Sequence, residues 1–66
     1  MKFREMLDAL RIKTYSVEIR DKDGNTVCAT SVFSKGILPY LGFDVTEWFP
    51  GAGAFQNVDF TVYLDM

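Results

Sequence analysis

The stretch that most constrains the fold runs from Tyr15 to Phe33, where a turn motif separates two segments of alternating polarity. The motif is Asp-Lys-Asp-Gly-Asn at positions 21–25. An aspartate at its first position accepts a hydrogen bond from the backbone two residues on, and Gly24 adopts a positive φ without a Cβ clash. These features favour a type I turn followed by a left-handed glycine, so the sequence predicts a β-hairpin that closes at positions 21 and 25.

Counting outward from this turn gives the expected pairs of the hairpin. One face carries Ile19 opposite Val27, Val17 opposite Ala29 and Tyr15 opposite Ser31, and the other face carries Arg20 with Thr26, Glu18 with Cys28 and Ser16 with Thr30. The first face is mostly apolar and the second mostly polar, as a half-buried antiparallel pair requires. A slip of one residue would mix the two faces, so the pattern predicts this register.

Apolar spacing before the hairpin predicts a helix over residues 2–11. Apolar side chains recur there at i, i+3, i+4 and i+7, on one face of a helix: Phe3, Met6, Leu7 and Leu10. A helix of this length is not stable alone in water. We therefore expect it to pack against the sheet.

After the hairpin, the pattern predicts a turn and a third strand. Residues 37–42 contain a proline and a closing glycine, which favour one irregular or 3₁₀ turn. Residues 44–49 alternate weakly and predict a strand with Thr46 and Trp48 on one face. The other face of that strand would carry Val45, Glu47 and Phe49.

Residues 57–64 form the clearest strand, because Val58, Phe60, Val62 and Leu64 alternate with polar side chains. The order of elements predicts a single α+β domain over residues 1–66, with the N-terminal helix packed on a small antiparallel sheet of three to four strands. The expected core is Phe3, Met6, Leu7, Leu10, Val17, Ile19, Val27, Ala29, Val58, Phe60, Val62 and Leu64.

Chain length limits how such a domain is stabilised. A chain of 66 residues leaves much apolar surface exposed, and small domains often add disulfides, a metal or oligomerisation. Its single cysteine, Cys28, allows no intrachain disulfide, and the absence of histidine argues against a structural zinc site. Oligomerisation or unusually good packing remains, so we expect a homo-oligomer.

Hydropathy along the chain predicts a cytoplasmic location and no membrane partner. No apolar run follows a basic start as in a signal peptide, and no stretch is long and apolar enough for a membrane span. A lone cysteine is typical of a reducing interior. The hydrophobic content of 48% argues for a folded domain.

Charge is unevenly distributed although the net charge is only −2. Residues 1–35 hold all seven Lys and Arg and five of the nine Asp and Glu, while residues 36–66 hold the other four acids and no base. One interpretation of this uneven distribution is chance in a short chain. The other is a polarised surface that orients a partner or a head-to-tail neighbour. The mild acidity argues against general nucleic-acid binding, which normally uses a basic stripe.

No residue pattern supports catalysis. Cys28 has no histidine to act as its base, and Asp44 and Glu47 share a segment without any indication of a pocket. The motif at 21–25 fails the spacing of an EF-hand loop, which requires glycine at position 6 and glutamate at position 12. We therefore expect no enzyme activity, no cofactor, no metal and no small-molecule substrate.

An aromatic cluster in the second half is the best candidate for function: Tyr40, Phe43, Trp48, Phe49 and Phe55. One interpretation is that these side chains complete the core or a dimer seam. A second is an exposed protein-binding surface, because Trp, Tyr and Phe dominate such contacts. The candidate binding residues are then Tyr40, Phe43, Trp48 and Phe49 as anchors, with Asp44 and Glu47 as orienting charges. Base stacking on single-stranded nucleic acid is a third interpretation, but it requires nearby Lys or Arg.

The order of motifs resembles that of a known group of small proteins. A short helix opening at Met1, the Asp-Gly hairpin, residues 38–40 (Leu-Pro-Tyr) and a closing strand at residues 58–64 are similar to the uncharacterised accessory proteins of bacterial phages and integrative elements. This resemblance implies an origin in a mobile element and assigns no catalytic residues.

Together these features predict a non-enzymatic cytoplasmic protein-binding module that self-associates or binds a host protein. The alternative is a nucleic-acid-binding module that uses the basic first half, with Arg4, Arg11, Lys13 and Arg20.

Overall fold

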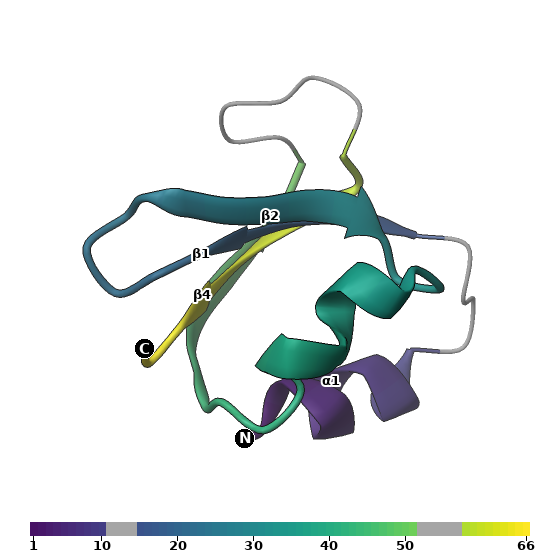
Figure 1. Ribbon diagram of the computed structural model, residues 1–66, viewed down its shortest axis with the longest axis horizontal. Coiled ribbons are helices and arrows are strands. Elements are labelled where there is room, and N and C mark those ends of the chain that lie inside the picture. Colours follow the sequence, from purple (N-terminus) through teal and green to yellow (C-terminus); the bar gives the residue numbers. More distant parts are fainter. Residues whose placement is uncertain (11–14, 52–57) are drawn as a thin grey trace.

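The computed structural model describes residues 1–10, 15–51 and 58–66. Its elements are helix α1 (Phe3–Ala9), strands β1 (Ser16–Arg20) and β2 (Thr26–Ser31), 3₁₀ helix η1 (Lys35–Tyr40), and strands β3 (Val45–Pro50) and β4 (Phe60–Leu64). The predicted order of elements and the α+β class are confirmed (Figure 1).

The four strands form one sheet in the order β2-β1-β4-β3. β1 pairs with β2 and β3 pairs with β4 in antiparallel fashion, whereas the central strands β1 and β4 are parallel. The sheet is therefore mixed and not entirely antiparallel as we expected. The reason is η1, which carries the chain from the β2 edge to the far edge, so that β4 returns in the direction of β1 (Figure 1).

The hairpin turn forms as predicted. Asp21 Oδ1 accepts hydrogen bonds from the backbone N–H groups of Asp23 and Asn25, both at 2.9 Å. Gly24 has φ +88°, and the Asp21 N–H donates to the Asn25 carbonyl at 3.0 Å. The Asp21 side chain thus stabilises the loop, and the positive φ of Gly24 allows the loop to close.

The register beyond the turn differs from the prediction by one residue. Arg20 pairs with Thr26, but Ile19 then pairs with Cys28, because the register shifts by a β-bulge at Val27. A bulge places two residues opposite one and turns the following side chains to the other face. The predicted core positions Val27 and Ala29 are therefore wrong: both are exposed, and Cys28 packs against the core instead.

A second bulge changes the predicted faces of β3. Val45 pairs with Leu64 and Glu47 with Tyr63, so Thr46 is the extra residue. Val45, which we expected on the face opposite to Trp48, packs against the core.

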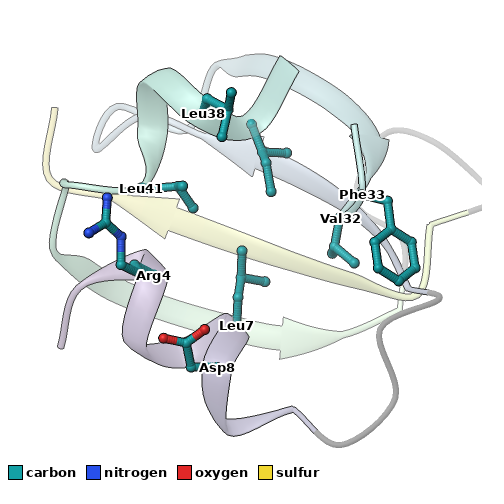
Figure 2. A pocket seen from close by; sticks show the side chains of 8 residues that line it. Arg4, Leu7, Asp8, Val32, Phe33, Leu38 and Leu41 are labelled. Atoms are coloured by element: carbon teal, nitrogen blue, oxygen red, sulfur yellow. The ribbon is translucent and has the colours of Figure 1, made fainter. Parts of the chain in front are cut away.

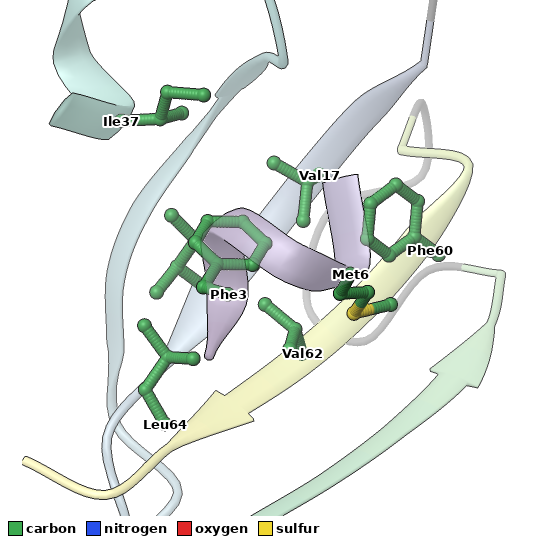
Figure 3. Close-up of a cluster of buried hydrophobic side chains, with 8 residues drawn as sticks. Phe3, Met6, Val17, Ile37, Phe60, Val62 and Leu64 are labelled. Atoms are coloured by element: carbon green, nitrogen blue, oxygen red, sulfur yellow. The ribbon is translucent and has the colours of Figure 1, made fainter. Parts of the chain in front are cut away.

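The core lies between the sheet and one layer formed by α1 and η1 (Figures 1 and 3). Its buried side chains are Phe3, Met6, Val17, Ile19, Ile37, Phe60, Val62 and Leu64. Leu7 and Leu10 are partly buried against this cluster, as is expected at the margin of a short helix. Ile37 was not predicted as core, because its segment shows no apolar periodicity.

The N-terminal segment is fastened to the chain that follows η1. The Phe3 and Arg4 N–H groups donate to the carbonyls of Phe43 and Leu41 at 2.9 and 3.1 Å. The Val45 N–H donates to the Met1 carbonyl at 2.7 Å. The first two bonds satisfy two N–H groups of the first turn of α1 that have no partner within the helix, and all three fasten the N-terminal segment to residues 41–45. Among the described residues, no helix has the length and hydropathy to cross a membrane.

Candidate protein-binding surface

The structure separates the predicted anchors Trp48 and Phe49. Trp48 pairs with the buried Val62 and lies on the side of the sheet that carries α1, with 56% of its surface exposed. Phe49 lies on the other side, where its ring is 6.2 Å from that of Tyr63. Glu47 shares that second side and is exposed.

The other predicted residues have mainly structural contacts. Tyr40 ends η1 and is partly buried against the core. Phe43 is 37% exposed, and its carbonyl holds the start of α1. Asp44 forms an exposed ion pair with Lys2 at 3.4 Å, a contact that contributes little to stability. Phe55 lies outside the described residues. The six candidates therefore do not form one surface.

Trp48 instead belongs to an apolar groove between α1 and the β3–β4 hairpin. The groove has a volume of about 390 Å³ and is lined by Met1, Met6, Ala9, Leu10, Tyr15, Trp48, Pro50, Asp59 and Phe60. Met1 is 68% exposed beside it. Sequence reasoning did not find this site, because its walls come from the helix, the central strand and the edge strand, which are distant in the chain.

The walls of the groove are held by specific contacts. The rings of Tyr15 and Phe60 meet edge to face, with centroids 5.9 Å apart. Asp59 Oδ2 accepts hydrogen bonds from the Ser16 N–H at 2.9 Å and the Ser16 hydroxyl at 3.3 Å. The groove is therefore built on fixed side chains, and its carboxylate is already engaged.

The outer edge of β3 runs beside this groove. The Gly51 N–H donates to the Asp59 carbonyl at 2.8 Å, so the alternate residues Phe49 and Glu47 also direct their backbone groups toward β4. The N–H and C=O of Trp48 consequently face outward. Pro50 sits at an outward-facing position, where its missing N–H costs the sheet no hydrogen bond.

A second, smaller groove lies between α1 and η1, with a volume of about 280 Å³ (Figure 2). Leu7, Val32 and Leu41 line it, and Arg4 and Asp8 extend from α1 on one side. Phe33 and Leu38, which also line it, are 67% and 59% exposed. Val32 and Phe33 directly follow β2, which is the other edge strand of the sheet.

A polar cluster on the sheet side away from α1 engages one of the basic candidates. Arg20 Nε donates to Glu18 Oε2 at 2.6 Å, and Thr26 Oγ1 donates to the same oxygen at 2.9 Å. The hydrogen bond from Arg20 to Glu18, and the charge of that carboxylate, raise the pKa of the Arg20 guanidinium above its usual value. Its carbon Cζ also lies 5.8 Å from the centre of the Tyr63 ring. Arg20 is thus committed to an internal ion pair.

The remaining basic candidates do not gather around Arg20 in the part of the chain that the structure describes. Arg4 is exposed on α1, whereas Arg11 and Lys13 fall outside the described residues. Within residues 1–10, 15–51 and 58–66, no group of three or more His, Cys, Asp or Glu side chains is arranged to hold a metal ion. No family model, curated protein or solved structure matches the chain.

Proposed function

We propose that this chain is a non-enzymatic cytoplasmic protein-binding module of phage or mobile-element origin, and that it binds through the Trp48 surface. The Trp48 surface consists of Trp48, Pro50 and Met1 around the groove, together with the outward backbone groups of β3. The observation that carries the proposal is the exposure of the sole tryptophan over half its surface, directly above an apolar groove.

Physical chemistry supports binding at this surface over the other candidates. Tryptophan in a well-formed pocket is enriched among the residues that dominate binding energy. An adjacent sheet edge adds backbone hydrogen bonds, which fix the orientation of a bound strand. The groove beside Leu38 is smaller and is not lined by the sole tryptophan, and Phe49 is partly covered by Tyr63.

The nucleic-acid alternative has weaker support. One of its four candidate cations, Arg20, is held in an ion pair with Glu18. The acidic residues Asp44, Glu47 and Asp59 are exposed on or beside the β3–β4 hairpin, where they would repel phosphate.

Affinity capture from lysate of the source cell, with and without nuclease, tests the proposal. We expect the tagged protein to enrich a specific protein in both samples. Trp48→Ala should abolish this capture, whereas Phe33→Ala should retain it, because Phe33 is a similarly exposed aromatic residue on the other groove. Thermal unfolding of both variants establishes that each is folded.

Capture that survives Trp48→Ala in a folded protein would reject the Trp48 surface as the binding site. Capture that disappears with nuclease would reject a protein partner and favour the nucleic-acid alternative.

A further inference from the structure

We propose that the partner of the Trp48 surface is a second copy of this chain, which pairs antiparallel with β3 to make one continuous sheet. This inference rests on the proposed function of the same surface. It begins from the free part of the β3 edge. Within residues 1–10, 15–51 and 58–66, only Met1 and Lys2 cover this edge, at Asp44 and Val45, so the open stretch runs from Thr46 to Pro50.

The outward backbone groups define the register of the pair. Residues of an antiparallel pair exchange two hydrogen bonds where their backbone groups face each other. Trp48 lies at the centre of the open stretch and faces outward, so a two-fold axis through it pairs Trp48 with Trp48 of the second copy. The same register places Thr46 opposite Pro50, whose carbonyl accepts a hydrogen bond although its nitrogen has no proton to donate.

The ends of the open stretch fit this register. In the first copy, Met1 covers β3 at Val45. In the proposed register, Pro50 of the second copy lies opposite Thr46 and Gly51 lies opposite Val45. β3 ends at Pro50, and the following Gly51 has φ +91°. The strand of the second copy therefore ends opposite Thr46, one position before Val45, whose N–H donates to the Met1 carbonyl.

The side chains of the pair are also compatible. Glu47 is the only charged residue between Thr46 and Pro50, and the register sets it opposite Phe49 of the second copy and diagonal to the other Glu47. Like charges directly opposite each other would destabilise the pair. On the other side of the sheet, the two Trp48 rings meet and join the two grooves into one apolar trough between the α1 helices.

The small size of this interface predicts weak association that closes at two copies. The open stretch holds five residues per copy, Thr46 to Pro50, whereas each side of a standard interface contributes roughly 20–30 residues. The bulge at Thr46 and the proline at Pro50 limit pairing to the short central stretch. Because both copies use the β3 edge, the interface is isologous and pairing at β3 closes at two copies, while β2 stays the outer edge strand of each copy.

Sedimentation equilibrium from about 10 µM to about 1 mM, the range in which weak interfaces associate, tests the proposal. We expect wild type to form dimers, and the emission of its sole tryptophan to shift to shorter wavelength with rising concentration. Trp48→Lys places two positive charges across the two-fold axis and should weaken the dimer by about tenfold or more. The control Phe33→Lys introduces the same charge at the other groove and should dimerise like wild type.

A wild-type protein that stays monomeric over this range would overturn the second-copy inference, as would a dimer that Trp48→Lys leaves intact. A monomer that still captures a different protein through Trp48 would overturn this inference alone and leave the proposed function standing. A monomer without Trp48-dependent capture would overturn both.

Discussion

At the scale of single residues, two side chains and one glycine account for the local geometry of the hairpin. Asp21 holds the turn through two backbone hydrogen bonds, and Gly24 provides the positive φ that the turn requires. Glu18 is fully buried and receives hydrogen bonds from Arg20 and Thr26. The turn was predictable because its chemistry is local. The buried carboxylate was not, since an alternating strand predicts a solvated polar face.

Gly24→Ala should lower the free energy of unfolding by about 1–2 kcal/mol, because an L side chain in the left-handed region clashes with its own backbone. Gly42→Ala is the matched control: a Cβ at Gly42 meets no atom within 4 Å, and its φ is not positive. We expect that control to change stability by less than about 0.5 kcal/mol. Urea unfolding of both variants measures the difference, and equal losses would contradict the assigned turn.

Arg20→Met should destabilise the fold more than the double variant that carries Glu18→Met and Arg20→Met. Removing the cation alone leaves a buried carboxylate without its counter-charge, whereas removing both charges replaces the pair by apolar packing. Thermal unfolding at neutral pH gives the order of the Tm values. A double variant with the lower Tm would show that the ion pair itself stabilises the sheet.

At the scale of elements, bulges explain most of what the sequence could not predict. Alternation correctly predicted β4 from Phe60 to Leu64 and the Arg20–Thr26 pair beside the turn, since those stretches contain no extra residue. Val58, predicted as core, precedes β4 and is not part of the core. It failed at Val27 and Thr46, where one inserted residue reverses the later faces. Nothing in the local pattern marks such a position, because the bulge is selected by which side chains reach the core. In β2, Cys28 packs against the core in the place predicted for Val27, although valine is the more typical strand residue.

The same substitution at two valines tests the bulged register. Val17 is fully buried and Val27 is 38% exposed. Val17→Ala should cost about 2 kcal/mol or more through lost burial and a residual cavity. Val27→Ala should cost under about 1 kcal/mol, the span of strand propensity. Chemical denaturation provides both values, and similar losses would support the unbulged register in which both side chains face the core.

At the scale of the whole molecule, the fold brings α1 beside an edge strand and leaves a groove open between them. The order of elements and the α+β class were predictable from periodicity, but the parallel central pair was not, because it depends on how η1 crosses the sheet. Trp48 was identified as a candidate from composition. Its true neighbours, Met1 and Leu10 among them, are assembled only by long-range contacts between α1 and the sheet.

The most direct test of the account is amide hydrogen exchange at Trp48, measured by NMR at low and at high protein concentration. The Trp48 N–H faces outward in a single copy, whereas the Phe49 N–H faces β4. We predict fast exchange at Trp48 in dilute protein, protection that rises with concentration, and slow exchange at Phe49 throughout. A Trp48 amide that exchanges equally fast at both concentrations would contradict pairing of a second strand at this edge.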